Sequence, residues 1–263
     1  MDVAELVESV RPVLDGALIA TDFDGTLAPL VPDPQDSRPV AGALDALTAL
    51  TERGARVAVI TGRDAGTVVR LGGLDSIAGL TVAGLYGLET WTAGKLTSPA
   101  EPDAIGELRA RLPALLADAH ADPKVWIEDK RLSLVVHARK ADDPDAALAT
   151  LSEPLSTLAR ELDLEVHPGA HVLELRLPGF DKGGALAQLV AAYPPRAVVY
   201  FGDDLGDLPA FAEIGRRRAA GALAWSVGVL SSGVPDVAAA VDVQVADPAA
   251  AVAVLTALAA PAQ

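Results

Sequence analysis

The chain has 263 residues, a hydrophobic content of 51%, a formal net charge of −15 and no cysteine. This charge argues against nucleic acid or an anionic membrane as a main partner, since both are bound through basic patches, and the lack of cysteine excludes disulfides and thiolate chemistry. The N-terminus is acidic and amphipathic, unlike a signal peptide, and no uninterrupted apolar segment reaches membrane-spanning length. We therefore expect a soluble cytoplasmic protein. We also expect a monomer.

The first part of the chain alternates between patterns typical of strands and of helices. Short apolar runs predict strands that are covered on both faces, and leucines at helical spacing predict a helix that ends at Gly54. This rhythm indicates a doubly wound α/β sheet. The predicted strands cover residues 17–20, 56–63 and 80–87, and the predicted helix covers residues 39–53.

The middle of the chain has a different pattern. Two leucine-rich helical segments, which begin near Pro102 and at Asp143, each precede a pair of runs in which apolar and polar residues alternate. Alternating runs joined by short turns predict an antiparallel sheet with one open face. We therefore predict a small α+β domain over residues 100–178, inserted into a core domain made of residues 1–99 and 179–263. The alternating runs are 125–130, 132–139, 164–167 and 171–177.

The parallel pattern returns after Gly179. A helix is predicted over residues 181–193, and a buried strand over 197–204 ends in a pair of acids. Two further strands are expected at 222–229 and 240–245, before a final helix capped by Asp247.

Four polar clusters stand at the ends of these strands or at a helix start. In an open parallel sheet, binding sites form outside the carboxyl ends of the strands, where the loops converge. Each cluster by itself is also compatible with an ordinary turn, because Asp–Gly, Asp–Asp and Thr–Gly are common turn sequences. Together they indicate one composite site. The clusters are Asp22 and Asp24 with Thr26, Thr61 with Gly62, Lys182 with Gly183, and Asp203 and Asp204 with Asp207.

The same clusters resemble a known pattern. "DFDGTLAPL" resembles the D-x-D-G-T signature of the haloacid-dehalogenase superfamily of phosphohydrolases, and "ITGR", "DKGGAL" and "FGDDLGD" resemble its other three motifs in the same order, over residues 18–207. The insertion between the second and third motifs corresponds to the α/β cap domain of the superfamily. The resemblance implies a Rossmann-like catalytic core with an inserted cap.

The resemblance also implies a mechanism. Asp22 would be the nucleophile, and a carboxylate nucleophile splits a very slow hydrolysis into the formation and breakdown of an aspartyl-phosphate. Asp22, the Asp24 backbone carbonyl and Asp203 would hold Mg²⁺, a hard cation that prefers oxygen ligands, with Asp204 and Asp207 as outer supports or a partial ligand. The Asp24 side chain would protonate the leaving alcohol and later deprotonate the attacking water.

The phosphoryl group would be bound by the remaining motif residues. Thr61, Lys182 at a helix start, and backbone N–H groups near Gly25 would contact or neutralise its oxygens. Neighbouring motif residues are expected to contact the substrate as well. These are Thr26, Gly62 and Arg63.

The insertion carries a more specific resemblance. "VWIEDKRLSLVVHAR" resembles the V-E-D-K-x-x-S-L-x-x-H-Y-R signature of the trehalose-6-phosphate phosphatases, "VHPGAHVLELRLPGFDKGGAL" resembles their G-K-x-V-x-E-L-R-P … K-G segment, and "GLYGLE" resembles their G-x-H-G-x-E. The implied activity is Mg²⁺-dependent hydrolysis of trehalose 6-phosphate to trehalose and phosphate. The implied sugar contacts are Glu128, Lys130, Glu174 and Arg139.

A structural alternative exists for these cap residues, which could be charges on the outer face of a half-exposed sheet. For Arg176 the outer-face interpretation is preferred, and His137 is interpreted as a histidine that packs within its strand. The sequence also departs from the family pattern. Tyr86 replaces the usual histidine, "GDDLGDLPAF" lacks the usual Thr-Asp-Glu-Asp run, and Ala170 or His171 falls where a basic residue is common. Another sugar or pseudo-disaccharide phosphate is therefore the alternative substrate.

Two other classes of protein share part of the pattern. A signalling receiver domain has a phosphorylatable aspartate, an acid pair, a threonine and a lysine on a parallel sheet. Here the acid pair Asp203–Asp204 comes late and a large insertion intervenes, and a receiver has neither feature. A catalytically silent binding or regulatory module would be signalled by loss of an essential acid, and none is lost.

Overall fold

A computed structural model describes residues 1–169 and 171–261 of the chain. It divides the chain into two compact units. The core unit consists of Met1–Ser98 and Phe180–Gln263, and the inserted unit consists of Pro99–Gly179. No helix in the described residues is both long enough and apolar enough to cross a bilayer.

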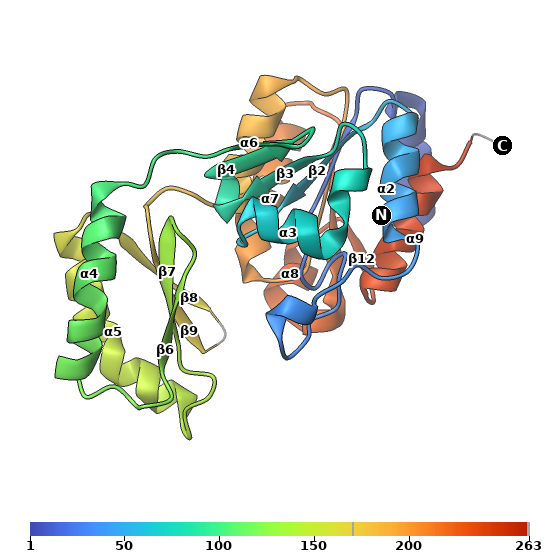
Figure 1. Ribbon diagram of the computed structural model, residues 1–263. Helices are drawn as coiled ribbons and strands as arrows, with labels where there is room; N and C mark the ends of the chain where they lie inside the picture. Colours follow the sequence, from blue (N-terminus) through green and yellow to red (C-terminus); the bar gives the residue numbers. More distant parts are fainter. Residues whose placement is uncertain (170, 262–263) are drawn as a thin grey trace. The chain divides into compact units, whose positions relative to one another are not determined.

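The core unit is built on a sheet with helices packed around it (Figure 1). The sheet has eight strands in the order β12-β11-β10-β1-β2-β3-β4-β5. The first six strands in this order are parallel, and β4 and β5 extend the sheet as an antiparallel hairpin. This confirms the predicted parallel-sheet fold. The strands are β1 Leu18–Thr21, β2 Arg56–Ile60, β3 Thr81–Gly84, β4 Glu89–Thr92, β5 Lys95–Thr97, β10 Val198–Gly202, β11 Ala224–Val229 and β12 Val243–Val245.

Helices cover both faces of this sheet. Alternate residues of one strand point to opposite faces, so Ile19 of β1 packs into one apolar cluster while Leu18 and Ala20 pack into another. Both faces are therefore buried, which explains the continuous apolar runs in the sequence. The first cluster includes α1 (Val3–Val10), α2 (Ala43–Glu52), α3 (Ala65–Gly72) and α9 (Pro248–Ala259), and the second includes α6 (Lys182–Ala192), α7 (Leu208–Ala219) and α8 (Pro235–Ala240).

The sequence patterns miss or misplace some of these elements. The strand predicted over residues 80–87 ends at Gly84, because Leu85–Gly87 turn away in a short 3₁₀ helix with a left-handed Tyr86 (φ 59°). The patterns do not indicate α3, whose central Thr and Val residues are β-branched and favour strands, or α7, which contains both Pro209 and Gly215. They also do not indicate the β4–β5 hairpin.

The inserted unit has a four-stranded antiparallel sheet in the order β6-β7-β9-β8. The apolar residues of the strands pack against α4 and α5 in a separate hydrophobic core, while the other face of the sheet carries the polar residues Glu128, His137 and Glu174. Alternation in the sequence thus predicts which side chains share a face. The elements are α4 Asp103–Asp118, β6 Trp126–Asp129, β7 Ser133–His137, α5 Pro144–Glu161, β8 Glu165–Gly169 and β9 Val172–Arg176.

Candidate active site

Two buried acids meet at the carboxyl ends of neighbouring strands. Asp22 follows β1 directly and Asp203 follows β10 directly, and the backbone N–H of Asp22 donates to the carbonyl of Phe201 at 2.9 Å. The two side chains are 4% and 1% exposed. Because β1 and β10 pair in parallel, the register of the sheet places acids from distant motifs side by side.

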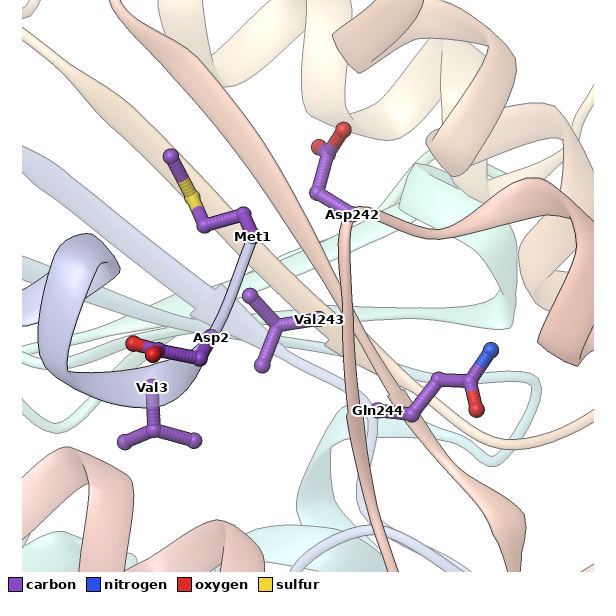
Figure 2. A pocket seen from close by; sticks show the side chains of 6 residues that line it. All are labelled: Met1, Asp2, Val3, Asp242, Val243 and Gln244. Carbon is purple, nitrogen blue, oxygen red and sulfur yellow. The ribbon is translucent and has the colours of Figure 1, made fainter.

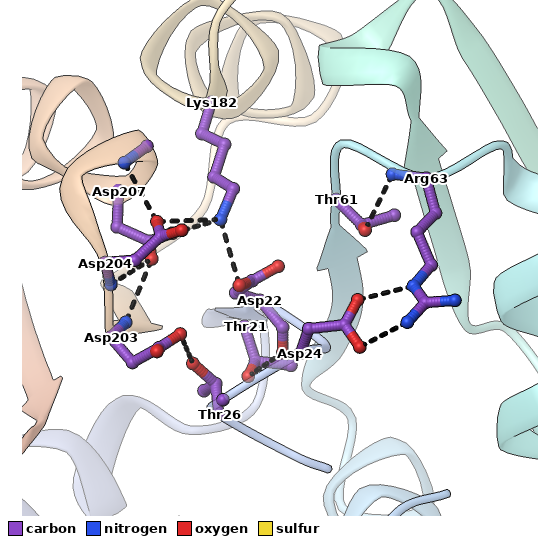
Figure 3. Close-up of polar contacts among 12 residues, drawn as sticks. Thr21, Asp22, Asp24, Thr26, Thr61, Arg63, Lys182, Asp203, Asp204 and Asp207 are labelled. Atoms are coloured by element: carbon purple, nitrogen blue, oxygen red, sulfur yellow. Dashed lines mark hydrogen bonds and ion pairs between the residues drawn. The ribbon is translucent and has the colours of Figure 1, made fainter. Parts of the chain in front are cut away.

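Lys182 supplies the positive charge at this site. It is the first residue of α6, whose N-terminus is capped by the Asp181 side chain, and it is 4% exposed. Its Nζ lies 2.9 Å from Asp22 Oδ2 and 2.7 Å from Asp207 Oδ1 (Figure 3). The positive end of the helix dipole adds to this charge. The nucleophile candidate therefore faces a fixed cation.

Asp207 links Lys182 to the backbone that carries Asp203. Its Oδ1 accepts hydrogen bonds from Lys182 and from the hydroxyl of Tyr200, at 2.7 Å and 2.5 Å. Its Oδ2 accepts from the backbone N–H groups of Asp203 and Asp204, at 2.9 Å and 3.1 Å. Burial by itself would raise the pKa of Asp207, but Lys182 and these hydrogen bonds hold it below its usual value. Four donors therefore hold this carboxylate, which in turn fixes the backbone at Asp203 and Asp204.

At Asp22 and Asp203, burial outweighs the nearby positive charge and disfavours the ionised carboxylates. Burial raises the pKa of Asp22 well above its usual value despite the nearby Lys182. Burial, and then the charges of Asp204 and Asp207, raise the pKa of Asp203 to about 7. A divalent cation between these carboxylates would favour their ionised forms.

The donor set fits a hard cation. Asp22, Asp203 and Asp207 each offer a carboxylate oxygen, and these oxygens lie within 4.8 Å of one another. Since Asp207 is occupied by four hydrogen bonds, Asp22 and Asp203 are the side chains left to bind the ion. Carboxylate oxygens suit Mg²⁺.

Gly25 and Thr26 pack against the carboxylate of Asp203. Gly25 has a left-handed backbone (φ +79°), and a Cβ there would lie 2.1 Å from Asp203 Oδ2, so only glycine fits. The Thr26 hydroxyl donates to Asp203 Oδ1 at 3.2 Å and is fully buried. The sequence predicts substrate contact for both residues, and the structure places both against Asp203.

Asp24 is held by Arg63 rather than by the acidic group around Lys182. Arg63 Nε donates to Asp24 Oδ2 at 2.5 Å and Nη2 donates to Oδ1 at 2.7 Å (Figure 3). The hydroxyl of Ser37 also donates to Oδ1, at 2.9 Å. Arg63 in turn donates to the carbonyl of Pro34 at 2.8 Å. The carboxylate predicted to transfer protons is thus oriented by three hydrogen bonds.

Thr61 and Gly62 lie in the loop after β2. Thr61 Oγ1 accepts from the backbone N–H of Arg63 at 3.1 Å, and its own N–H donates to the carbonyl of Ala83. A Cβ on Gly62 would lie 2.7 Å from the Tyr86 hydroxyl, so the residue that departs from the family pattern stands directly against this loop. The motif is therefore held by the neighbouring β3–β4 connection.

The four predicted sugar contacts all lie in the inserted unit. Glu128 is paired with His137, whose Nε2 lies 2.7 Å from its Oε2. Glu174 is 5% exposed and accepts from Ser133 Oγ at 2.6 Å and Lys130 Nζ at 3.4 Å. Arg139 lies beyond the end of β7 and is exposed. Glu128 and Glu174 share the polar sheet face, while Lys130 follows the end of β6.

Arg176 lies on the polar face of the sheet with Glu174, as the outer-face interpretation expects, but it is buried there rather than exposed. It is 5% exposed, and its Nε donates to Glu165 Oε1 at 2.7 Å. The reason is its strand, because β9 lies between β7 and β8, whose side chains cover it. Of the pair noted before β9, Ala170 lies outside the described residues, and His171 is exposed, with Nδ1 3.4 Å from Asp145 Oδ1.

Sequence reasoning missed two residues that the structure brings into the site. Tyr200 is fully buried in β10 and donates to Asp207, and Ser37 donates to Asp24. A signal for Tyr200 exists, since it is the residue with a hydroxyl in an otherwise apolar buried strand, and a buried hydroxyl needs a partner. Ser37 lies in a proline-rich loop with no comparable signal.

A surface pocket of the core unit lies apart from these residues. Figure 2 shows the side chains that line it. Asp242 and Val243 of this lining stand at the amino-terminal end of β12, whereas the acids of the site lie at carboxyl ends of strands. Its lining includes none of the predicted site residues and consists of Met1, Asp2, Val3, Asp242, Val243 and Gln244.

Comparison with known proteins gives consistent matches. A family model described as trehalose-phosphatase matches residues 20–249. A trehalose-phosphate phosphatase of Mycolicibacterium paratuberculosis is 34% identical over 208 residues, which cover 72% of this chain and 49% of the relative. The chain thus spans about half the length of the curated relatives it matches.

Solved structures extend the comparison. The trehalose-6-phosphate phosphatase of Aspergillus fumigatus superposes with a TM-score of 0.71 at 26% identity, covering 98% of this chain and 97% of that chain. The C-terminal domain of a Candida albicans trehalose synthase regulatory protein superposes with a TM-score of 0.75 at 12% identity, covering 97% and 98%. The second likeness concerns the fold alone.

Proposed function

Because the chain belongs to the trehalose-phosphatase family, we propose that it is a Mg²⁺-dependent phosphatase that hydrolyses trehalose 6-phosphate to trehalose and phosphate. One observation carries the proposal within the structure: buried Asp22 lies against Lys182, at the same edge of the sheet as Asp203. The same fold occurs in a protein titled a regulatory protein, so the argument rests on these side chains and not on the fold.

In the first step, an Asp22 carboxylate oxygen attacks the phosphorus and the bond from phosphorus to the sugar oxygen breaks. Asp24 donates a proton to the departing oxygen, which gives trehalose and an aspartyl-phosphate on Asp22. In the second step, Asp24 takes a proton from water, and this water oxygen attacks the phosphorus to release phosphate and restore Asp22. The Arg63 and Ser37 hydrogen bonds set where the Asp24 carboxyl group stands.

An anion that attacks an anion needs positive charge nearby. Lys182 supplies one positive charge at 2.9 Å from Asp22, and the buried setting strengthens its effect. Mg²⁺ held by Asp22, the Asp24 carbonyl and Asp203 would neutralise further negative charge on the phosphoryl group. Thr61, in the loop after β2, and the turn at Gly25 would contact the phosphoryl oxygens.

The inserted unit would act as a cap domain that selects the sugar. Its polar sheet face carries carboxylates and a lysine, which can accept from and donate to sugar hydroxyls. Glu128, with a side chain that is 47% exposed, is more accessible than Lys130 and Glu174, whose side chains are 19% and 6% exposed. A related sugar phosphate or pseudo-disaccharide phosphate is the alternative substrate.

Phosphate release from a panel of substrates with Mg²⁺ tests the proposal. The panel contains trehalose 6-phosphate, glucose 6-phosphate, other disaccharide phosphates and p-nitrophenyl phosphate. We expect trehalose 6-phosphate to have the highest kcat/KM. Equal rates on glucose 6-phosphate would contradict sugar selection by the cap, and no turnover of any substrate would indicate a silent binding module.

A further inference from the structure

We propose that His137 is a positioning residue that aims Glu128 at the sugar and thereby sets the affinity for the substrate. This inference rests on the proposed function and goes beyond it, since His137 is not one of the proposed sugar contacts. The sequence favours a packing role for this histidine. The structure gives its ring nitrogen a specific partner on the neighbouring strand, with Nε2 at 2.7 Å from Glu128 Oε2.

The contact joins a buried residue to an exposed one. In the β6–β7 pairing Trp126 stands opposite His137, and Glu128 stands opposite Val135, so His137 reaches Glu128 along a diagonal. His137 is 8% exposed, whereas the side chain of Glu128 is 47% exposed. A fixed group inside the sheet therefore restrains a carboxylate that solvent and substrate can reach.

The hydrogen bond also fixes which nitrogen of the ring carries the proton. An ionised carboxylate only accepts, so Nε2 must be the donor. The other nitrogen, Nδ1, is buried and has no hydrogen-bond partner in the residues that the structure describes. The neutral ring with its proton on Nε2 satisfies both facts, because it leaves no buried N–H group without an acceptor.

The ring itself is held in place by stacking. The rings of His137 and Trp126 are nearly parallel, at an angle of 8°, with their centroids 4.5 Å apart. Lys140 Nζ lies 4.8 Å from the centroid of the Trp126 ring. The imidazole is thus locked in a direction that points its N–H at Glu128.

On the other side of β7, a second carboxylate is also held by a side chain of this strand. Val135 pairs with Glu128 on one side and with Glu174 on the other. Ser133, two residues before Val135, donates to Glu174 at 2.6 Å, and His137, two residues after it, contacts Glu128. The central strand therefore carries one positioning group for each proposed sugar carboxylate.

Holding Glu128 in place should change the affinity for the substrate more than the rate of the chemical step. A free glutamate side chain samples several rotamers and loses this freedom when it binds a sugar hydroxyl. A glutamate that is already oriented loses less, so the substrate binds more tightly. Since His137 and Glu128 lie in the inserted unit, we expect no effect on a small aryl phosphate that makes no sugar contact.

The experiment measures kcat and KM for trehalose 6-phosphate and for p-nitrophenyl phosphate in five variants and the unmodified protein. H137F keeps a ring for stacking and loses the N–H donor, while H137Q keeps a donor. E128A, which removes the acceptor, completes a double-mutant cycle with and without H137F. H120F is the matched control, because His120 is an exposed histidine of the same unit that lies outside the sheet.

We expect H137F to raise KM for trehalose 6-phosphate about tenfold, the loss of one charge-assisted hydrogen bond, with kcat and aryl phosphate turnover unchanged. H137Q should recover most of the affinity, and H137F should add nothing in the E128A background, where the acceptor is gone. H120F should match the unmodified protein.

Three results would overturn the inference while the proposed function stands. The first is an unchanged KM in H137F, and the second is an equal KM in H137Q and H137F. The third is a loss of aryl phosphate turnover that parallels the loss on the sugar phosphate, because a parallel loss indicates a structural role. If H137F does not fold, H137L, which also lacks the N–H donor, replaces it in the cycle and is judged by the same three results. If the unmodified protein turns over aryl phosphate but no trehalose 6-phosphate, both the proposed substrate and the inference fail.

Discussion

Arg63 binds Asp24 through two parallel hydrogen bonds, from Nε to Oδ2 at 2.5 Å and from Nη2 to Oδ1 at 2.7 Å. The side chains are 17% and 27% exposed, so the pair is partly shielded from water. A fork-to-fork pair fixes the plane of the carboxylate as well as its position. A positioning role for Arg63 is therefore an alternative to the substrate contact that its motif implies.

The first prediction separates these two roles of Arg63. If Arg63 positions Asp24, then Arg63→Lys should lower kcat about tenfold, because a lysine cannot reproduce the paired geometry, and the loss should vanish in an Asp24→Asn background. Steady-state kinetics of both singles and the double variant measure this. Arg70→Lys, a nearby exposed arginine bonded to Gln35, is the control. A full loss that persists in the Asp24→Asn background would mean that Arg63 contacts the phosphate.

The second prediction concerns the covalent intermediate. Asp24→Asn removes the base for the second step, while p-nitrophenolate leaves without needing a proton. This variant should therefore show a burst of about one p-nitrophenolate per protein molecule, followed by turnover slowed about 10²- to 10⁴-fold. Stopped-flow absorbance and intact-protein mass spectrometry would detect the burst and the phosphorylated chain. Asp22→Asn should show neither, and turnover that survives in Asp22→Asn would exclude Asp22 as the nucleophile.

The third prediction concerns Mg²⁺ and pH. In the metal-free protein the pKa of Asp203 is about 7, against 3.8 for an ordinary aspartate. The folded state thus binds the proton more tightly than the unfolded state, so this group stabilises the fold fully below about pH 4, and the contribution is lost as the pH rises to about 7. Because Mg²⁺ binds the ionised carboxylate, its stabilising effect should grow over the same range.

Thermal melting with Mg²⁺ or EDTA at several pH values measures this effect. At a Mg²⁺ concentration of 100 Kd the stabilisation is about 2.7 kcal/mol. This corresponds to a rise in Tm of roughly 5–10 °C for a chain of this length. Asp203→Asn should remove most of the rise and flatten its pH dependence. A rise in Tm that is as large at pH 5 as at pH 8 would contradict the prediction.

The fourth prediction tests the close approach at Gly25. Gly25→Ala places a Cβ 2.1 Å from Asp203 Oδ2 and should displace that carboxylate, with a large loss of activity and of Mg²⁺ affinity. Gly79→Ala is a matched control, because Gly79 has nearly the same φ (+77°) and nothing within 4 Å of its Cβ position. Both variants carry a backbone penalty of about 1 kcal/mol, but only the first should lose activity. Calorimetry and Mg²⁺ titration separate the two effects.

The parallel-sheet core was predictable because its signals are local. Apolar runs that end in Asp22, Thr61 and Asp203 indicate both the strands and the edge where their loops meet. Chain alternation also showed that Glu128 and Glu174 stand on defined sheet faces. In contrast, α3 was missed because its Val68 and Val69 favour strands, and only packing on the sheet makes that segment helical.

The sequence by itself determined which acids gather at one sheet edge, since a motif at each strand end suffices for that. Only the tertiary structure decided what each acid contacts. It directs Asp24 to Arg63, surrounds Asp207 with four donors and pairs Glu128 with His137. The physical reason is that periodicity fixes the face on which a side chain stands. The direction in which a carboxylate points depends on donors that other strands and loops bring to it.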